Sequence, residues 1–262
     1  MDINLTGKRA IVCGASKGMG RATAIELASL GVGVTLIARR ADVLEQVKAV
    51  LDTSKGQKHH ALALDVSDIK TLKEKIAAHV KAAGPFHILV NNTGGPPAGP
   101  AYLAAVEDFE KAFHQHLLAS HVLVQAVIEG MKSEKYGRII NVISTSVKQP
   151  IKGLGVSNTI RAAVANWAKT LAGELGPLGI TVNNILPGPI DTDRMKEIVE
   201  GKAQKTGKNV EEIISEEKAA VPLGRYGKPE EIAQTIAFLA SPSAAYINGI
   251  NLPVDGGRTS SL

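Results

Sequence analysis

Residues 9–20 read Arg9-Ala-Ile-Val-Cys-Gly-Ala-Ser-Lys-Gly-Met-Gly20, an apolar run that passes directly into three closely spaced glycines. The run is typical of a buried strand, and residues 19–30 carry apolar side chains at the spacing of a helix. Gly14, Gly18 and Gly20 therefore lie where a strand turns into a helix. Because glycine has no Cβ, the backbone can turn tightly there and approach a pyrophosphate at the positive end of the helix. The alternative is a tight turn that binds nothing.

The same succession of strand and helix continues along the chain. Short apolar or β-branched runs that suit buried parallel strands occupy residues 9–14, 33–38, 60–64, 88–91, 138–143, 180–185 and 250–254. Apolar residues at helical spacing occupy residues 19–30, 41–51, 69–82, 106–131, 154–175 and 230–239. This alternation predicts an α/β fold, a parallel sheet covered by helices on both faces with right-handed crossovers. Residues 192–222 break the rhythm and are rich in Lys and Glu, which predicts an inserted helical lid.

Composition excludes several classes of protein. A chain of 262 residues with 44% hydrophobic content is sufficient for one large domain. The net charge is +5, but the basic residues alternate with acidic ones and form no dense run with aromatic residues, so we expect no nucleic-acid partner. The longest apolar stretch, residues 117–128, contains polar side chains and is too short to cross a bilayer, so we expect no membrane partner.

The only cysteine and the N-terminus indicate the compartment. Cys13 cannot form an internal disulfide, and its position beside the glycines predicts a packing residue in a reducing compartment. The first residues lack the basic start and the apolar run of a signal peptide. We therefore expect a cytoplasmic protein.

Several further motifs resemble those of the short-chain dehydrogenase/reductase family, and the resemblance covers essentially the whole chain. The glycine spacing is G-x-x-x-G-x-G, Ser144 follows the fifth predicted strand, and the matching C-terminal segments are residues 222–231, 248–249 and 254–257. The chain is similar to 3-oxoacyl-[acyl-carrier-protein] reductases within that family. The resemblance implies one doubly wound Rossmann domain over residues 1–262, with about seven strands in the order 3-2-1-4-5-6-7. It also implies a nicotinamide cofactor and oxidoreductase activity on a small molecule.

The family resemblance assigns a set of cofactor-binding residues. Asp65 and Val66 take the place of the adenine contact, and Thr93 replaces Ala in the turn under the adenine ribose. Pro187 and Gly188 begin the loop on the nicotinamide side of the cofactor. The full implied set is Gly14, Ser16, Lys17, Gly18, Met19, Gly20, Arg39, Arg40, Asp65, Val66, Asn91, Thr93, Gly94, Arg161, Pro187, Gly188, Ile190 and Thr192. For the turn at residues 91–94 and the loop at residues 187–192, a purely structural role is the alternative.

The end of the second predicted strand indicates which nicotinamide cofactor is bound. Enzymes that select NAD(H) usually carry an acidic residue there for the ribose 2′-hydroxyl, but this chain has Ala38-Arg39-Arg40. A guanidinium can pair bidentately with a 2′-phosphate, and Lys17 adds a positive charge from the glycine loop. We therefore expect NADP(H) in preference to NAD(H). The alternative is that both arginines are ordinary solvated residues.

The family's catalytic pattern is altered. Members use a serine after the fifth strand, a Tyr-x-x-x-Lys pair on the following helix and an asparagine on the fourth helix. Counting from Ser144, the Tyr and Lys positions hold Ser157 and Arg161. Aligning residues 125–127 with the equivalent helix of the family puts His116 at the Asn position. A serine hydroxyl is a poor proton donor, and an arginine stays protonated. Arg161 can still bind the nicotinamide ribose, a substrate carboxylate or an enolate oxygen.

Two other side chains are candidate proton donors. His116 has a reference pKa near 6.5, and Lys148 lies on the loop after Ser144. A packed histidine and a solvated lysine are the alternatives. We expect no metal, because His114, His116 and His121 have no acidic or cysteine ligands at suitable spacing.

The altered residues leave the chemistry open. Carbonyl reduction needs a proton donor, whereas hydride addition to an activated alkene gives an enolate that mainly needs electrostatic stabilisation. A non-catalytic paralogue that binds the cofactor as a sensor or structural subunit is the alternative to an enzyme.

The long fourth and fifth helices, including Trp167, predict a four-helix contact between subunits and hence a homotetramer.

Overall fold

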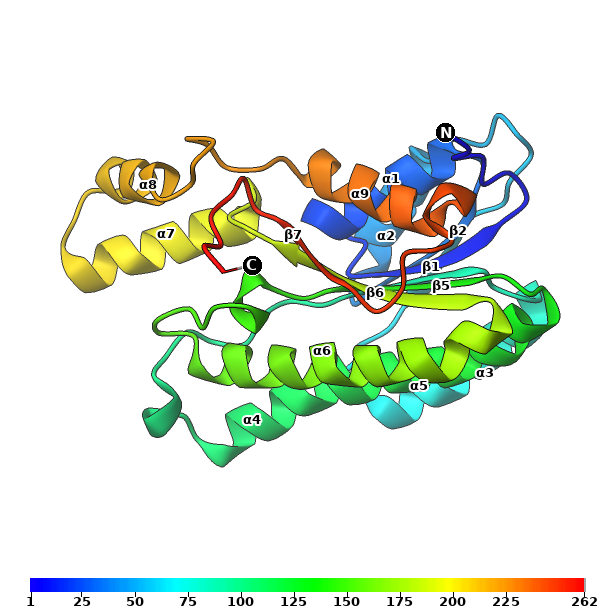
Figure 1. Ribbon diagram of the computed structural model, residues 1–262, viewed down its shortest axis with the longest axis horizontal. Helices are drawn as coiled ribbons and strands as arrows, with labels where there is room; N and C mark the ends of the chain where they lie inside the picture. Colours follow the sequence, from blue (N-terminus) through cyan, green and yellow to red (C-terminus); the bar gives the residue numbers. More distant parts are fainter. Residues whose placement is uncertain (262) are drawn as a thin grey trace.

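The computed structural model describes residues 1–261, which form a seven-stranded parallel sheet with the order β3-β2-β1-β4-β5-β6-β7. This is the predicted Rossmann arrangement (Figure 1). The strands are β1 (Arg9–Cys13), β2 (Gly33–Ala38), β3 (His60–Ala63), β4 (Ile88–Asn92), β5 (Gly137–Val142), β6 (Ile180–Pro187) and β7 (Asn251–Val254).

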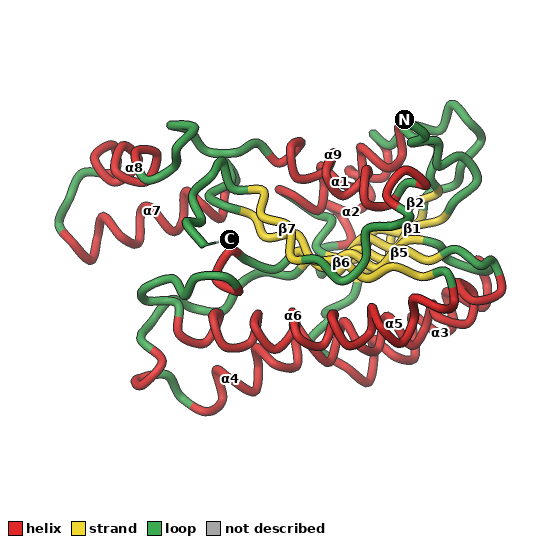
Figure 2. Tube along the Cα trace, in the orientation of Figure 1, coloured by secondary structure: helices red, strands yellow, loops and turns green. Residues whose placement is uncertain are grey.

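Helices cover both faces of the sheet, as Figures 1 and 2 show. One face is packed by α1 (Gly18–Ser29), α2 (Ala41–Ala49) and α9 (Pro229–Ala240), and the other by α3 (Ile69–Ala83), α5 (Ala119–Ser133) and α6 (Gly155–Leu175). Within residues 1–261, no helix combines the length and the low polarity that crossing a membrane requires.

The first strand explains why the sheet needs both layers of helices. Alternate side chains of a strand point to opposite faces, and in β1 both sets are apolar. Val12 packs in the core shared with α1 and α9, whereas Ile11 and Cys13 pack in the core shared with α3 and α5. Burial raises the pKa of the Cys13 thiol to about 12, so the side chain is a neutral packing residue, as predicted.

The helix predicted over residues 106–131 differs in one respect. It consists of α4 (Val106–Phe113), a π-helical turn (His114–Leu118) and α5. A π turn inserts an extra residue into an α-helix and so turns the side chains that follow it, which apolar spacing alone does not reveal. The turn places His116 in the interior, with 5% of its surface exposed.

Residues 192–222 form the helical pair that the sequence predicts. The pair consists of α7 (Asp193–Thr206) and α8 (Val210–Ala219), which extend beyond the carboxyl ends of the strands (Figure 1). Val199, Ala203 and Ile213 pack against one another in a small core of their own. The role of this pair as a lid stays a prediction.

Candidate active site

The glycine loop has the backbone conformation that the sequence predicts. Gly14 and Gly18 have positive φ angles of 61° and 56°, which residues with side chains rarely adopt. A Cβ on Gly14 would lie 2.6 Å from the Asn92 carbonyl oxygen, and one on Gly20 would lie 2.2 Å from the Gly14 carbonyl oxygen. No side chain caps the N-terminus of α1, and its first turn contains no acidic residue. The loop therefore leaves backbone N–H groups available and fits a dinucleotide pyrophosphate.

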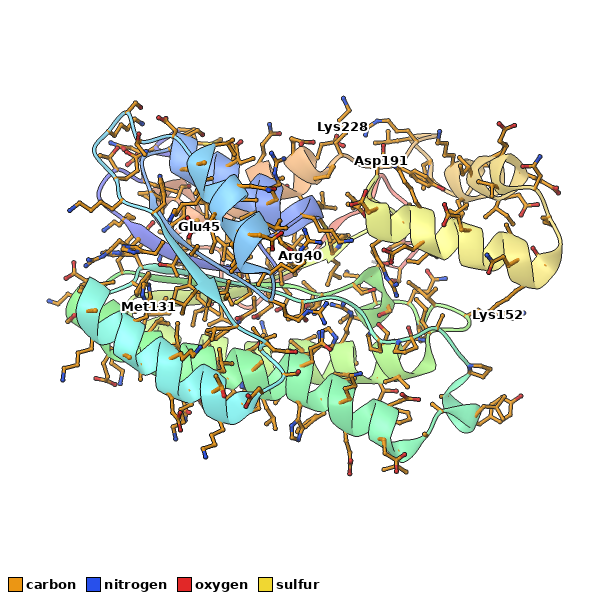
Figure 3. All side chains as sticks on the ribbon, turned by 180° about the vertical axis from the view of Figure 1, so that it is seen from behind. Arg40, Glu45, Met131, Lys152, Asp191 and Lys228 are labelled. Carbon is orange, nitrogen blue, oxygen red and sulfur yellow. The ribbon has the colours of Figure 1, made fainter. Side chains whose placement is uncertain are left out.

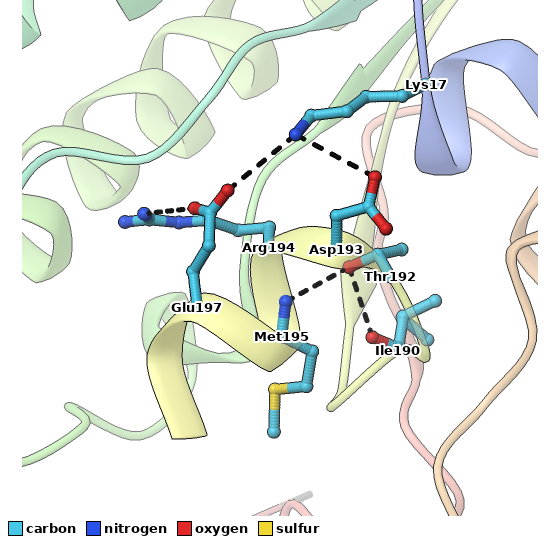
Figure 4. Close-up of polar contacts among 7 residues, drawn as sticks. All are labelled: Lys17, Ile190, Thr192, Asp193, Arg194, Met195 and Glu197. Carbon is cyan, nitrogen blue, oxygen red and sulfur yellow. Dashed lines mark hydrogen bonds and ion pairs between the residues drawn. The ribbon is translucent and has the colours of Figure 1, made fainter. Parts of the chain in front are cut away.

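The glycine loop lies against the segment that follows β6. A Cβ on Gly18 would be 3.3 Å from the Thr192 methyl group. The Lys17 ammonium lies 3.9 Å from Asp193 and 3.8 Å from Glu197 on α7 (Figure 4). The Thr192 hydroxyl accepts a hydrogen bond from the Met195 N–H (3.3 Å) and so caps α7. Two stretches of the predicted cofactor site, far apart in sequence, are therefore neighbours, and α7 is joined to them through Lys17.

The remaining residues of these two stretches form supporting structure. Met19 packs on the core between α1 and α9, and Ser16 is half-buried in the loop. Gly188 approaches the main chain of Asp255 so closely that a Cβ would lie 2.7 Å from the Asp255 Cα. Pro187 ends β6, and Ile190 is buried. This loop is therefore tightly packed.

Arg39 and Arg40 are exposed where the chain leaves β2 and enters α2, and Figure 3 labels Arg40 at this point. The Arg40 guanidinium is 3.6 Å from the Asp42 carboxylate, an exposed pair that is easily exchanged for another anion. A hydrogen bond from the Ser67 hydroxyl, with a smaller contribution from the charge of Arg39, holds the pKa of Asp65 below its usual value. Arg39 and Asp65 therefore lie close together at the ends of β2 and β3. Val66 packs against the core on the α3 face.

The end of β4 and the turn after it are hydrogen-bonded to neighbouring elements of the protein. The Asn91 side chain is buried, and its amide nitrogen donates to the side-chain amide oxygen of Asn141 (2.8 Å). Thr93 shares a hydrogen bond of 2.6 Å with His116 Nδ1. The Gly94 carbonyl accepts from Gln115 (3.0 Å). Two of the three predicted ribose-turn residues thus use their polar groups to hold the π turn.

Sequence reasoning missed a ladder of asparagines across the sheet. Asn91 donates to Asn141, Asn141 donates to Asn184 (2.9 Å), and Asn184 donates to Asn251 (2.8 Å). These residues occupy one register row of β4, β5, β6 and β7. A detectable signal was present, because each of the four predicted strands contains an asparagine among apolar residues.

Ser144 and Ser157 occupy the ends of neighbouring elements. Ser144 follows β5 and caps a short 3₁₀ turn (Thr145–Val147), where its Oγ accepts from the Ser146 N–H (3.1 Å). Ser157 lies in the first turn of α6 and is buried. Lys148 follows the 3₁₀ turn and is half-buried. Within residues 1–261, no group of acidic, histidine and cysteine side chains is arranged to hold a metal ion.

Arg161 lies in the interior one helical turn after Ser157. Its side chain is 7% exposed, and one terminal nitrogen donates to the carbonyls of Val142 (3.2 Å) and Ile143 (2.9 Å) at the end of β5. The other terminal nitrogen lies beside Gly95, where a Cβ would be 3.7 Å away. Burial lowers the pKa of Arg161 to about 10, so the guanidinium stays charged at neutral pH.

His116 does not have the titration behaviour that the sequence suggests. Burial, with a further contribution from the charge of Arg161, lowers its pKa to about 3. The imidazole is therefore neutral at neutral pH, and it is a poorer proton donor than a histidine with the reference pKa near 6.5. Its Nε2 is buried and has no hydrogen-bond partner among the described residues.

Comparison with known proteins agrees with this arrangement. Residues 14–259 match a family model described as Enoyl-(Acyl carrier protein) reductase. The chain is 34% identical over 257 residues to the 3-oxoacyl-[acyl-carrier-protein] reductase FabG of Vibrio harveyi, which covers 97% of this chain and 98% of that protein. It is 31% identical over 259 residues to the NADPH-dependent reductase BacG of Bacillus subtilis. This alignment covers 98% of this chain and 100% of that protein.

A solved structure gives the same result. The L-sorbose reductase from Gluconobacter frateurii, complexed with NADPH and L-sorbose, superposes with a TM-score of 0.93 at 30% identity over 100% of both chains. NADPH in these relatives agrees with the cofactor preference expected from Arg39 and Arg40. The strand order, the glycine loop and these similarities together establish that the chain belongs to the short-chain dehydrogenase/reductase family of oxidoreductases.

Proposed function

We propose that the chain is an NADP(H)-dependent oxidoreductase that acts on a small molecule with an altered set of active-site residues. The glycine loop and the exposed pair Arg39 and Arg40 support NADP(H), as do the NADPH-dependent relatives. The bound cofactor supplies or accepts the hydride. Ser144, Ser157 and Arg161 supply the polar groups at the end of β5 and the start of α6.

The observation that carries the proposal is the buried Arg161 guanidinium at the carboxyl end of β5. Its hydrogen bonds to the Val142 and Ile143 carbonyls hold a positive charge directly before Ser144. Such a fixed charge stabilises an oxyanion that develops nearby, and low solvent access increases the effect. The Ser144 and Ser157 hydroxyls are hydrogen-bond donors for the same oxygen.

The titration of this cluster favours one type of reaction. A pKa of about 3 for His116 and of about 10 for Arg161 leaves neither group able to exchange a proton readily near neutral pH. Reduction of a carbonyl needs such an exchange at the oxygen. Hydride addition to an activated alkene instead gives an enolate whose oxygen must be stabilised, and whose α-carbon then takes a proton from water. We therefore assign the reduction of activated alkenes as the preferred activity. Carbonyl reduction, with Lys148 as the donor, is the second candidate.

NADPH oxidation measured against a panel of enones and ketones tests the proposal. We expect turnover of enones and a loss of about tenfold to a thousandfold in kcat in Ser144→Ala. Ser133→Ala, an exposed serine at the far end of α5, is the matched control and should keep full activity. Turnover of ketones alone, abolished by Lys148→Ala, would favour the second candidate.

A protein that binds NADPH but turns over no substrate in the panel would contradict the proposed activity. That result would instead favour a cofactor-binding subunit or sensor without catalysis. Fluorescence of bound NADPH separates the two outcomes, because it reports binding in the absence of turnover.

A further inference from the structure

Arg161 is a buried cation that lacks an anionic partner. It is 7% exposed, and no acidic side chain within residues 1–261 forms an ion pair with it. Arg225 provides a contrast, because this exposed arginine binds both oxygens of Glu231 at 2.7 and 2.8 Å. A buried charge is costly unless it is paired and hydrogen-bonded. Arg161 therefore has the properties of a binding residue whose anion comes from outside the chain.

The guanidinium is oriented so that part of it stays available. One terminal nitrogen is fixed by the Val142 and Ile143 carbonyls, but Nε and the other terminal nitrogen make no hydrogen bond to residues 1–261. The second nitrogen lies beside Gly95. A Cβ on Gly95 would meet no atom within 4 Å other than this nitrogen. Two parallel N–H groups on one edge match the two oxygens of a carboxylate.

His116 provides a second unsatisfied group beside Arg161. His116 is hydrogen-bonded to Thr93, and a terminal nitrogen of Arg161 lies beside Gly95, so both side chains meet the loop that follows β4. The Thr93 hydroxyl is 2.6 Å from Nδ1, and Nε2 is buried without a partner. When Thr93 donates to Nδ1 of the neutral ring, the single ring proton is on Nε2. Nε2 is then a second buried donor for the same anion.

The phosphates of the cofactor do not account for this pair of donors. The glycine loop packs on Asn92 and opens the helix α1, which covers one face of the sheet. Arg161 and His116 belong to α6 and to the π turn before α5, on the opposite face. The donors therefore come from the layer of helices opposite the one that the glycine loop opens.

We infer that Arg161 and His116 form a carboxylate-binding pocket, so that the substrate is a small organic acid with its reducible carbonyl or alkene close to the carboxylate. This inference deepens the proposed function and rests on it. The carboxylate is held by the Arg161 edge and by His116 Nε2, while Ser144 and Ser157 face the reacting oxygen. Neutral substrates leave Arg161 unpaired and bind weakly.

Binding of an acid and of its neutral ester tests the inference. The probes are 2-oxobutyrate and its methyl ester, titrated calorimetrically into the protein loaded with NADP⁺, which cannot donate a hydride. We expect the acid to bind about tenfold to a hundredfold more tightly than the ester, the range of charge-assisted hydrogen bonds. Equal binding of the two probes would overturn the inference, whatever the outcome of the turnover assays.

Variants identify the residues that produce the preference. Arg161→Gln and His116→Phe should each remove most of the preference for the acid. In His116→Phe, NADPH binding should stay within about threefold, a change smaller than the contribution of one charge-assisted hydrogen bond. Arg138→Gln is the matched control, because Arg138 is a buried arginine at the amino end of β5 and should keep the preference. Loss of NADPH binding in Arg161→Gln, with the acid preference intact in His116→Phe, would instead assign Arg161 to the cofactor and contradict the inference. If Arg161→Gln does not fold, the wild-type comparison and His116→Phe still decide the result.

Discussion

Arginine at position 161 can keep a charge where a lysine would tend to lose it. Burial disfavours the charged form of both residues, but arginine starts from a pKa so high that it stays protonated. The pKa of Arg161 falls to about 10, which still leaves the guanidinium charged at pH 7. Where the family resemblance implies a lysine that can exchange protons, we therefore expect a permanent cation. This residue therefore suits the binding of anions and the stabilisation of an oxyanion.

At the same scale, we expect Arg39 and Arg40 to set the preference between NADPH and NADH. Removing both guanidinium groups should weaken NADPH binding by at least about tenfold to a hundredfold, because even one charge-assisted hydrogen bond to a phosphate contributes about 1.5–3 kcal/mol. NADH has no 2′-phosphate, so its binding should stay unchanged. Titration of cofactor fluorescence in Arg39→Ala/Arg40→Ala measures both values, with the exposed Lys73→Ala as control. An equal loss for both cofactors would show that the arginines act on the fold of this segment instead.

His116 makes the stability of the protein depend on pH. Its pKa is lowered from 6.5 to about 3 in the folded protein, first by burial and then by the charge of Arg161. Below pH 6.5 the unfolded chain binds a proton that the folded protein does not, so the free energy of unfolding falls as the pH decreases towards 3. The slope from this single group is at most about 1.4 kcal/mol per pH unit.

Urea unfolding at pH 7, 6 and 5 measures this dependence. His116→Asn should unfold with a shallower dependence on pH than the wild type, and the exposed His114→Asn should retain the wild-type dependence. The same slope in His116→Asn and wild type would mean that His116 is protonated in the folded protein.

At the scale of elements, the asparagine ladder ties β4, β5, β6 and β7 together beneath the active site. Replacing Asn141 by Ala would leave a buried donor on Asn91 and a buried acceptor on Asn184 unsatisfied. Each such group costs about 1–3 kcal/mol, so we expect Asn141→Ala to lower the free energy of unfolding by about 2–5 kcal/mol. Denaturant unfolding tests this, with Gln204→Ala on the exposed face of α7 as a control that changes little. A change below about 1 kcal/mol in Asn141→Ala would indicate that water replaces the missing amide.

The sequence predicts the elements better than the contacts among them. Apolar runs and helical spacing locate all seven strands, and the family resemblance supplies their order, because buried parallel strands and amphipathic helices have distinct periods. The same spacing predicts one helix over residues 106–131, because apolar spacing alone does not reveal the extra residue of the π turn. The environment of His116 depends on Thr93 and Arg161, which lie on other elements. Its lowered pKa therefore appears only in three dimensions.

At the scale of the whole molecule, the two layers of helices contribute different parts of the site. The glycine loop opens α1 on one face, and Arg161 and His116 come from elements on the other face. The helices α7 and α8 lie beyond the strand ends and contact the loop through Lys17. The site therefore depends on the correct packing of both layers of helices on the sheet. An assembly of subunits that stabilises α5 and α6 would also stabilise the part of the site that holds Arg161.

The outer surface of α5 and α6 is where we expect four subunits to meet. Both helices are long and lie on the same face of the sheet (Figure 1). Trp167 is only half-buried within the chain and contacts His121 edge to face, with ring centres 6.2 Å apart. Ala162 is exposed on α6, where a small side chain lets another helix approach closely.

Light scattering of the purified protein should therefore give four times the mass of one chain, and Ala162→Arg should give dimers or monomers with unchanged helical content. Ala77→Arg, at an exposed alanine of α3, is the control that should leave the assembly intact. A monomeric wild type, or the same mass for Ala162→Arg and wild type, would exclude α6 from the subunit contact.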